Sequence, residues 1–323
     1  MIVVTGGAGF IGSAFVAKLN EEGRDDIVVV DELGTTEKWR NLVKRRYADY
    51  IHKDAFLEMV AGDRVPFPVS AAVHMGACSS TTERDADYLV ENNFHYTCRL
   101  ADWALAHGVR FIYASSAATY GDGAQGFSDG EETIRALRPI NMYGYSKQLF
   151  DLRVLRNGFQ DQVAGVKFFN VFGPNEYHKD DMTSVVFKAF HQIRETGKVR
   201  LFKSYRPEYG DGGQMRDFVY VKNSVEVLWW FLNHGEVNGI FNLGTGKART
   251  WNDLIRAVFA AMNLPPRIDY IEMPEAIRGQ YQYFTEAKME KLGAAGCPVA
   301  FHPLEEAVGD YVRNHLLQAD PYL

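Results

Sequence analysis

The stretch MIVVTGGAGFIG, residues 1–12 of a 323-residue chain, decides the fold class. A short β-branched run precedes the glycines, and IGSAFVAKL follows them with the apolar spacing of an amphipathic helix. Gly6, Gly9 and Gly12 follow the spacing GxxGxxG, and Gly7, Gly9 and Gly12 also satisfy GxGxxG. A tight turn requires positive φ, and a diphosphate requires a backbone without Cβ beside the free amides of a helix N-terminus. The stretch therefore predicts a turn that binds a dinucleotide.

The residues after this turn support the interpretation of the glycines as part of a dinucleotide-binding motif. A second strand, IVVVD, ends in Asp31 about twenty residues beyond the glycines, where a carboxylate meets the adenosine ribose. Asp31 favours NAD, because a carboxylate repels a 2′-phosphate. Lys38, Arg40 and Lys53 favour NADP, because a cation near this corner accepts that phosphate. Spacing alone leaves the choice between NAD and NADP open.

Strands and helices alternate through the first half of the chain. Strand patterns cover residues 71–77, 109–116 and 164–174, and helical patterns cover residues 87–106 and the region around Tyr143. This alternation predicts βαβ units and an α/β fold built on a doubly wound parallel sheet of the Rossmann type.

After Pro174 the alternation breaks. A polar loop, a helix near residues 184–195 and a Gly-rich loop precede two strand patterns, RDFVYV and GIFNLGTG. We therefore expect a second, smaller substrate-binding domain whose segments interleave with the first. The expected dinucleotide-binding domain covers residues 1–169 with contributions from residues 217–242, and the substrate-binding domain covers residues 170–216 and 243–323.

The composition argues against several functional classes. Hydrophobic residues make up 46% and charged residues 24%, as in ordinary globular domains, and a net charge of −6 does not favour nucleic acid or an anionic membrane as a partner. Cys78, Cys98 and Cys297 form no CxxC pair, so we expect neither a disulfide framework nor a metal site. The chain shows no targeting pattern and no apolar run of membrane-spanning length, so we expect a cytoplasmic protein.

The stretch NMYGYSK, residues 141–147, carries the candidate chemistry. In a helix, Tyr143 and Lys147 share a face because they are four residues apart, whereas Tyr145 lies elsewhere and is expected to be structural. A free phenol has a pKa of about 10, and an ammonium together with a positive nicotinamide favours the phenolate. Ser116 follows an apolar strand, at the sheet edge where such folds bind ligands. We expect Tyr143 to exchange a proton, Lys147 to act electrostatically and Ser116 to hold a substrate alcohol.

Three motifs, TGGAGFIG, SSAATYG and YGYSK, resemble those of the extended short-chain dehydrogenase/reductase family, which acts on nucleotide sugars. The resemblance covers nearly the whole chain. HMGACSSTTE, EYHKDDM, MRDFVYV, FNLGTG and GQYQYFT are similar to motifs of one branch, whose members invert C6 of an ADP-linked heptose. The resemblance implies a homopentameric epimerase that uses tightly bound NADP to oxidise and re-reduce a nucleotide sugar in lipopolysaccharide core synthesis.

The same resemblance implies roles for individual residues. The implied cofactor contacts, with the glycines of the turn, are Gly6, Gly9, Phe10, Ile11, Gly12, Asp31, Glu32, Lys38, Lys53, Met75, Gly76, Ala77, Cys78, Ser79, Asn92, Lys147, Val171 and Lys179. The implied substrate contacts are Ser116, Asn170, Asp181, Lys188, Phe202, Lys203, Ser204, Arg216 and Tyr281. Lys179 is expected to be a second acid/base beside Tyr143. Apart from the resemblance, the chemistry of Arg216 also favours a contact with a diphosphate, because the shape of a guanidinium group matches that of a diphosphate.

Three positions depart from the pattern of this branch. Met75 stands where an acid is expected, and Asp181 and Lys188 stand where a serine and a histidine are expected. These differences bear on sugar recognition rather than on the class of reaction.

Other activities carry signatures of their own. A 4,6-dehydratase typically has an Asp-Glu pair where Ala117 and Ala118 stand, and a UDP-hexose 4-epimerase needs no Lys179. A non-catalytic dinucleotide-binding sensor usually loses the tyrosine or the lysine that this chain retains. A metal site on the acids and histidine of residues 178–181 has no supporting spacing. The sequence therefore favours the epimerase, with these as alternatives.

Overall fold

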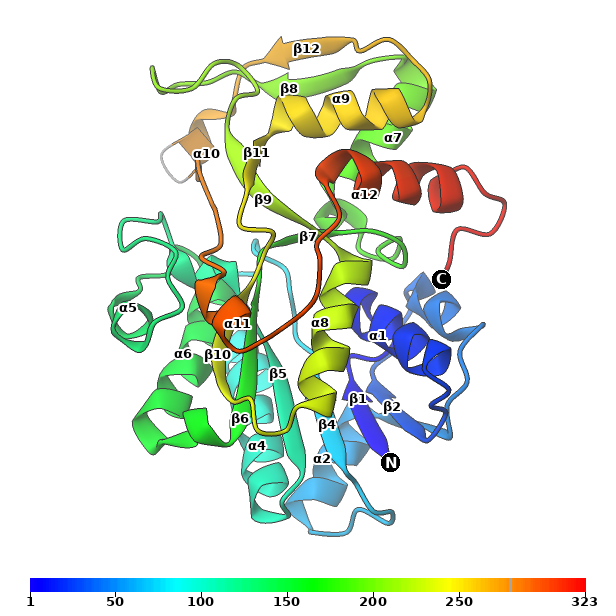
Figure 1. The fold of residues 1–323 in the computed structure, drawn as a ribbon, viewed down its shortest axis with the longest axis vertical. Helices are drawn as coiled ribbons and strands as arrows, with labels where there is room; N and C mark the ends of the chain where they lie inside the picture. The colour runs from blue at the N-terminus through cyan, green and yellow to red at the C-terminus, as the bar shows by residue number, and fades with distance from the viewer. Residues whose placement is uncertain (279–280) are drawn as a thin grey trace.

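A central parallel sheet of seven strands forms the base of the molecule, in the order β10-β6-β5-β4-β1-β2-β3 (Figure 1). The computed structural model describes residues 1–278 and 281–323. Every neighbouring pair in the large sheet is parallel, which confirms the doubly wound α/β fold that the sequence predicts. The strands are β1 (Ile2–Thr5), β2 (Ile27–Asp31), β3 (Asp49–His52), β4 (Ala71–His74), β5 (Arg110–Ser116), β6 (Val163–Phe168) and β10 (Gly239–Leu243).

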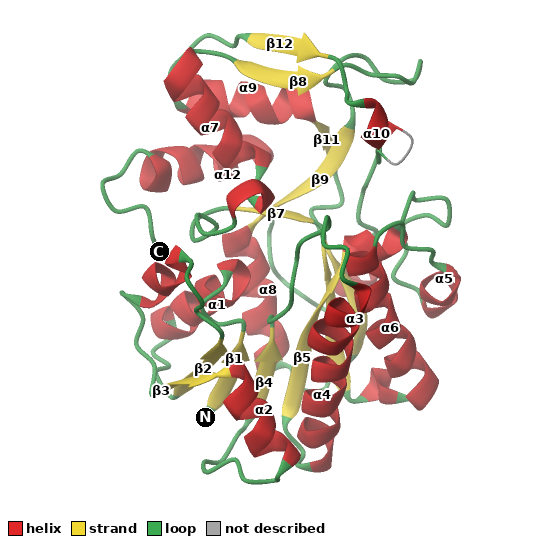
Figure 2. Ribbon diagram, turned by 180° about the vertical axis from the view of Figure 1, so that it is seen from behind, coloured by secondary structure: helices red, strands yellow, loops and turns green. Residues whose placement is uncertain are grey.

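Helices cover both faces of this sheet, as Figures 1 and 2 show from opposite sides. On one face lie α1 (Phe10–Glu21) and α8 (Val221–Asn233), and on the other lie α2 (Lys53–Ala61), α4 (Tyr96–Ala106) and α6 (Met142–Asn157). In β1, Ile2 and Val4 pack in the core cluster of α1 and α8, whereas Val3 packs in the cluster of α2, α4 and α6. Strands that are apolar at every position, such as β1 and β2, are therefore buried on both sides.

A smaller body lies beyond the carboxyl ends of the large sheet, at the top of Figure 1. It contains a three-stranded sheet ordered β11-β9-β7 and a two-stranded sheet ordered β12-β8. The strands are β7 (Asn170–Phe172), β8 (Val199–Phe202), β9 (Met215–Tyr220), β11 (Ala248–Thr250) and β12 (Ile268–Ile271). The packed helices are α7 (Val185–Thr196), α9 (Trp251–Ala261) and α12 (Leu304–Tyr311).

Short helices complete the chain. Those of α type are α3 (Ala86–Leu89), α5 (Glu131–Ala136), α10 (Glu275–Arg278) and α11 (Glu290–Ala294). The 3₁₀ and π segments are η1 (Glu37–Leu42), η2 (Val90–His95), η3 (Ala117–Tyr120), η4 (Phe159–Asp161), η5 (Asp180–Met182) and η6 (Val312–Leu316). Within the described ranges, no helix combines the length and apolarity needed to cross a bilayer.

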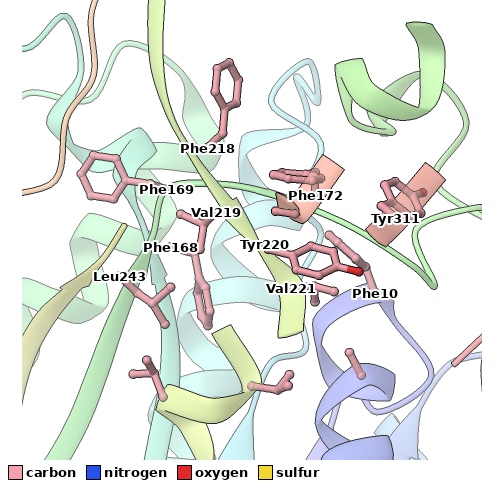
Figure 3. Packing of buried hydrophobic residues seen from close by; sticks show 14 of the residues in the cluster. Phe10, Phe168, Phe169, Phe172, Phe218, Val219, Tyr220, Val221, Leu243 and Tyr311 are labelled. Atoms are coloured by element: carbon pink, nitrogen blue, oxygen red, sulfur yellow. The ribbon is translucent and has the colours of Figure 1, made fainter. Parts of the chain in front are cut away.

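The apolar core continues from the large sheet into the smaller body (Figure 3). Phe168 ends β6, whereas Phe172 lies in β7 and packs against Tyr220 of β9, with ring centroids 5.5 Å apart. Tyr311 of α12 lies 6.4 Å from Phe172, centroid to centroid. Because the large sheet and the smaller body share one hydrophobic core, the smaller body packs firmly against the carboxyl ends of the large sheet.

Two predicted strands are shorter in the structure than the sequence patterns indicate. The pattern over residues 164–174 is divided, because β6 ends at Phe168 and β7 belongs to the three-stranded sheet. The N–H of Phe169 still bonds to the carbonyl oxygen of Leu243, at 3.1 Å, where the chain leaves the large sheet. The strand predicted over residues 71–77 ends at His74, so residues 75–77 are free to line a cavity.

The helix predicted over residues 87–106 contains a π segment, η2, between α3 and α4. Asn93 of η2 is buried and bonds through its side chain to the N–H and the carbonyl oxygen of Cys78, at 2.9 and 3.0 Å. It also donates to Ser146 Oγ at 3.0 Å. Since π segments are frequent at functional sites, this irregularity marks the region that joins the loop after β4 to α6.

A buried ion pair joins α6 to β6. Lys167 Nζ lies 2.5 Å from Asp151 Oδ2, and neither side chain is exposed. Asp151 also accepts hydrogen bonds from Tyr113 Oη (2.9 Å) and Ser115 Oγ (2.6 Å), and Lys167 donates to Thr119 Oγ1 (2.8 Å). Each charge is therefore compensated by its partner and by polar neighbours on β5 and η3.

We expect Lys167→Met to lower the free energy of unfolding by about 3–5 kcal/mol, because it leaves the Asp151 carboxylate buried without a counter-ion. Urea denaturation measures the loss. The matched control is Arg153→Met in α6, the helix that carries Asp151, because the pair of Arg153 with Asp102 has side chains 28% and 50% exposed. That exposed pair should contribute less than about 1 kcal/mol. Equal losses in the two variants would show that the buried pair has no special role.

Candidate active site

A cavity of about 780 Å³ lies where the carboxyl ends of the sheet strands face the smaller body. The large sheet contributes Gly6 after β1, Met75 after β4 and Ser116 at the end of β5. Val171 of β7 and Lys179 line the cavity from the other side. This is the position at which doubly wound sheets bind their ligands.

The turn between β1 and α1 is built from close backbone contacts. Gly6 has φ of 65°, and its N–H bonds to the carbonyl oxygen of Val30 at 2.7 Å. A Cβ at Gly12 would lie 2.1 Å from the carbonyl oxygen of Gly6, so a side chain does not fit there. Helix α1 begins at Phe10 with no side-chain cap and no acid in its first turn. Its amides are thus available to an anion, and the turn fits the diphosphate of a dinucleotide.

The carboxylate of Asp31 lies at the end of β2, beside this turn. Its Oδ2 accepts the N–H of Ala8 at 2.8 Å, and its Oδ1 accepts the N–H of Glu32 at 2.7 Å. Lys38 Nζ lies 2.8 Å from the same Oδ1. The chain itself therefore neutralises Asp31, which weakens the repulsion that the carboxylate would exert on a phosphate.

A smaller cavity of about 180 Å³ adjoins Asp31. Glu32 and Lys53 form an ion pair of 2.7 Å on its wall, and Lys53 Nζ donates to Asn92 Oδ1 at 3.0 Å. Tyr88 and Tyr96 complete the wall with aromatic surface. A cavity of mixed polarity, bordered by Asp31, two ammonium groups and two aromatic rings, suits the adenosine end of a dinucleotide.

Tyr143 and Lys147 line the large cavity together. Both lie in the first turns of α6, which begins after Asn141, whose Oδ1 accepts the N–H of Gly144 at 2.8 Å. Lys147 Nζ donates to the carbonyl oxygen of Ala114 at 2.8 Å, which fixes the ammonium beside the end of β5. Tyr145 is 46% exposed and does not line the cavity, as expected from its place on the helix.

Burial controls the proton affinity of this pair. It lowers the pKa of Lys147 to about 8, against the opposing charge of Asp151. Burial raises the pKa of Tyr143, and a hydrogen bond with Ser116 offsets this only in part. The lysine alone therefore does not lower the pKa of the phenol below its ordinary value, and activation depends also on the positive ring that the site would hold.

Lys179 reaches the cavity from the turn between β7 and α7. Its Nζ lies 5.3 Å from the centroid of the Phe10 ring, at the beginning of α1. Burial lowers the pKa of Lys179, and the charge of Glu176 opposes that shift. Glu176 is itself buried and accepts Ser184 Oγ at 2.7 Å, which fixes the start of α7. A second titratable group thus faces the cavity from an element other than α6.

Arg216 of β9 lies near the cavity but does not line it. It is only 8% exposed, and its carbon Cζ lies 5.7 Å from the ring of Trp251 and 5.5 Å from that of Tyr281. Its hydrogen bonds go to the carbonyl oxygens of Met215 and Gln282. Among residues 1–278 and 281–323 it forms no ion pair, so its charge is available to an anionic ligand.

The structure divides the sequence-predicted residues into three groups. Those that line the large cavity are Gly6, Gly9, Phe10, Ile11, Gly12, Asp31, Lys38, Met75, Gly76, Ala77, Cys78, Ser79, Ser116, Tyr143, Lys147, Asn170, Val171 and Lys179. Those on the adjoining smaller cavity include Glu32, Lys53 and Asn92. Those outside both cavities are Asp181, Lys188, Phe202, Lys203, Ser204, Arg216 and Tyr281. Gly279 and Gln280, which open the motif GQYQYFT, lie outside the described residues.

Several residues of the outer group have local partners instead. Lys188 Nζ donates to the carbonyl oxygen of Asp181 at 2.5 Å, and Lys203 pairs with Glu272 at 2.7 Å. Phe202 and Tyr281 face each other with ring centroids 6.3 Å apart, next to Arg216. The aromatic pair thus adjoins Arg216 through Tyr281, and none of these side chains is part of the cavity wall.

Sequence reasoning missed the aromatic residues that line the cavity beside Phe10 and Tyr143, which are Phe168, Phe169, Phe172, Phe218 and Trp251. Phe218 of β9 and Trp251 at the start of α9 both line it, with ring centroids 5.0 Å apart. A capping box between Thr250 and Asp253 fixes the start of α9 and thereby places Trp251. The capping box is the only feature of the neighbouring sequence that could have predicted the position of Trp251. For a metal, the described ranges contain no group of three or more His, Cys, Asp or Glu residues placed to bind one.

Comparisons with known proteins agree with this geometry. The model of the NAD dependent epimerase/dehydratase family matches residues 2–244. A protein from Nitratidesulfovibrio vulgaris (strain DP4), named ADP-L-glycero-D-manno-heptose-6-epimerase, is 62% identical over 323 residues, covering 100% of both chains. One of the same name from Fusobacterium nucleatum subsp. nucleatum is 49% identical over 332 aligned positions, again covering 100% of both chains.

Solved structures show the same likeness. The ADP-L-glycero-D-manno-heptose-6-epimerase of Helicobacter pylori has a TM-score of 0.82 at 25% identity, covering 97% of this chain and 95% of that chain. The UDP-glucose 4-epimerase of Thermus thermophilus, solved in complex with NAD, has a TM-score of 0.77 at 26% identity, covering 96% and 97%. With the family model matching most of its length and full-length relatives this similar, the chain belongs to the NAD dependent epimerase/dehydratase family.

Proposed function

We propose that this chain converts ADP-D-glycero-D-manno-heptose into ADP-L-glycero-D-manno-heptose by inverting C6, with a tightly bound NADP, in the synthesis of lipopolysaccharide core precursors. The observation that carries the proposal is that Tyr143, Lys147 and Lys179 line one cavity at the carboxyl ends of a dinucleotide-binding sheet. The relatives of that name, which align over their full length, support the choice of substrate. Lys179 favours this activity over 4-epimerisation of a UDP-hexose, which needs no second base.

The two parts of the chain divide the ligands between them in this proposal. Residues 1–169, with residues 217–242, hold the dinucleotide, and residues 170–216 and 243–323 hold the nucleotide sugar. When bound, the nicotinamide ring accepts the hydride of C6 and returns it. The chain removes the hydroxyl proton of the substrate and later replaces it, and Ser116 holds the oxygen that changes.

Inversion explains why two bases face one cavity. The turn after β1 would hold the cofactor in one place, so inversion at C6 requires the keto fragment to turn over between oxidation and reduction. The oxygen at C6 then lies on opposite sides of the site in the two steps. Proton transfer requires a donor–acceptor distance of about 2.6–3.2 Å, which one side chain cannot meet at both positions. We assign Tyr143, with Lys147 as its electrostatic partner, to one isomer and Lys179 to the other.

Arg216 is assigned to the diphosphate of the substrate. A buried guanidinium between two aromatic faces, with only carbonyl partners, retains its charge for an anion. Tyr281 lies beside it and packs against Phe202, and Lys203 and Ser204 follow directly after Phe202 at the end of β8. Asp181 in η5 and Lys188 in the first turn of α7 are assigned to the sugar of the substrate.

The assignment of NADP rests on Lys38 and Lys53. Because Asp31 already accepts three hydrogen bonds from the chain, its charge is compensated before a nucleotide arrives. The two ammonium groups border the adenosine cavity, and either can turn toward a 2′-phosphate.

Denaturing the purified protein should release NADP rather than NAD, as chromatography of the supernatant would establish. Lys38→Ala should reduce the preference for NADP over NAD by roughly ten- to a hundredfold, because a charge-assisted contact is lost. Arg40→Ala is the control, since Arg40 is exposed and paired with Glu37. A stoichiometric release of NAD from the wild-type protein would overturn the assignment of NADP.

Arg216→Ala should weaken substrate binding by about 2–4 kcal/mol, because one partner of a buried charge-assisted contact is removed. Calorimetric titration with the nucleotide sugar measures this loss, and the melting temperature should change little. The control is Arg249→Ala on the paired strand β11, where Arg249 already has Glu305 and Asp253 as partners. If binding and melting temperature fell together, Arg216 would have a structural role.

Tyr143→Phe and Lys179→Met should each lower the rate of epimerisation by roughly a hundred- to ten-thousandfold, because each removes one acid/base. Both variants should retain the bound nucleotide, which is measured after denaturation. Tyr145→Phe on the exposed face of α6 is the control and should be nearly silent.

A reaction in deuterated water separates hydride transfer from simple proton exchange at carbon. The product should contain no deuterium at C6, because that hydrogen stays within the site throughout. Solvent deuterium at C6 would require deprotonation of the carbon, and the oxidation–reduction scheme would be wrong.

A further inference from the structure

The last residues of the chain fold back onto the turn that carries Lys179. After η6, the tail (residues 318–323) runs from the smaller body toward the N-terminal helices, as Figure 1 shows in red and blue. Tyr177 Oη donates to the carbonyl oxygen of Pro321 at 2.8 Å, and the N–H of Leu323 donates to Asn175 Oδ1 at 3.1 Å. The rings of Tyr177 and Tyr322 meet edge to face, with centroids 5.1 Å apart.

The other side of the tail is attached to the first part of the chain. Lys44 Nζ donates to the carbonyl oxygen of Tyr322 at 2.9 Å and pairs with Asp320 at 2.8 Å. Arg45 donates to the main-chain oxygen of Leu323 at 2.5 Å. The tail therefore lies between residues that follow η1 and the turn that carries Lys179.

Asn175 joins this arrangement to the glycine-rich turn. It is fully buried and has φ of 75°, a backbone conformation that few residues other than glycine adopt. Its Nδ2 donates to Ser13 Oγ of α1 at 3.0 Å, and its carbonyl oxygen accepts Asn41 Nδ2 at 3.1 Å. Asn41 also donates to the carbonyl oxygen of Ala8 at 2.9 Å, within the glycine-rich turn.

We propose that Asn175 and the tail are positioning elements for Lys179, holding its turn in register with the glycine-rich turn so that the ammonium meets the reacting oxygen. The proposal rests on the proposed function, in which Lys179 is the second base. The turn itself is short: the N–H of Lys179 bonds to the carbonyl oxygen of Glu176 at 3.1 Å, which links Lys179 to the residue next to Asn175. A displacement of about 1 Å at a reacting group lowers a rate by up to about a hundredfold.

The contacts of the tail make this role selective. Its hydrogen bonds go to η6, to residues 44–45 and to the turn of Lys179, and within the described residues none reaches α6, which carries Tyr143. Loss of the tail should therefore impair the proton transfer of Lys179 and leave that of Tyr143 intact. A general contribution to stability would impair both.

Three variants test the proposal in the full-length protein with its bound nucleotide. Asn175→Gly removes both side-chain links, and glycine tolerates the positive φ. A chain that ends at Asp320 removes the contacts of residues 321–323. Tyr177→Phe removes one hydrogen bond and keeps the aromatic contact. Asn175→Asp keeps the acceptor for Leu323 and serves as the conservative rescue.

The measurement is single-turnover reduction of the bound nicotinamide, followed by absorbance, with each heptose isomer added separately. Tyr143→Phe and Lys179→Met show which isomer depends on which base. Asn175→Gly and the shortened chain should slow the isomer that depends on Lys179 by up to about a hundredfold. Tyr177→Phe should slow it by roughly three- to tenfold. The other isomer should react at the wild-type rate in all three variants.

A second readout does not depend on catalysis. Lys179 should be acetylated faster by a lysine-specific reagent in Asn175→Gly and in the shortened chain, as peptide mass spectrometry would show, because its turn is released. Asn238→Ala is the matched control: it removes one of the hydrogen-bond partners of Arg110, at the far end of the large sheet, and should alter stability without changing either readout.

The outcomes separate this inference from the proposed function. If Lys179→Met still interconverts the isomers, the two-base scheme is wrong and the positioning role fails with it. If Lys179→Met blocks interconversion while the tail variants react normally with both isomers, or slow both equally, only the positioning role is wrong.

Discussion

The close backbone contact between Gly6 and Gly12 is the constraint on which the rest of the site depends. It brings the end of β1 against the first turn of α1, where a Cβ at either position would collide with main-chain atoms. Helix α1 therefore points its free amides at the cavity, and its Phe10 lies beneath the Lys179 ammonium. The same helix accepts a hydrogen bond at Ser13 Oγ from Asn175, so the glycine-rich turn and the turn that carries Lys179 share one support.

A second set of interactions fixes the end of β5 beside Tyr143 and Lys147. Asp151 and Lys167 compensate each other in the core and hold Ser115 and Thr119 on either side of Ser116. The end of β5 is thereby fixed, and with it the carbonyl oxygen of Ala114 that receives Lys147. The two candidate bases thus depend on different interactions: a buried ion pair supports one, and contacts with α1 and the tail support the other.

Burial is the common electrostatic feature of the cavity. It lowers the pKa of both Lys147 and Lys179 and raises that of Tyr143, so all three groups are shifted toward their neutral forms. A positive charge introduced beside Tyr143 has a large effect, because charges interact more strongly with a buried phenol than with one in water. The proton chemistry is therefore coupled to occupancy of the nucleotide site rather than built into the chain alone.

The sequence by itself determined whatever depends on neighbours within a few residues: the turn after β1, the shared helical face of Tyr143 and Lys147, and the exposed place of Tyr145. The alternation of strands and helices was likewise sufficient for the doubly wound sheet. Tertiary structure decided that the strand over residues 164–174 divides between two sheets, that Trp251 and Phe218 line the cavity, and that Arg216 lies between two aromatic rings. It also decided that the tail meets Asn175, 148 positions away. Such contacts have no local signal, because they arise only when distant segments bury a common core.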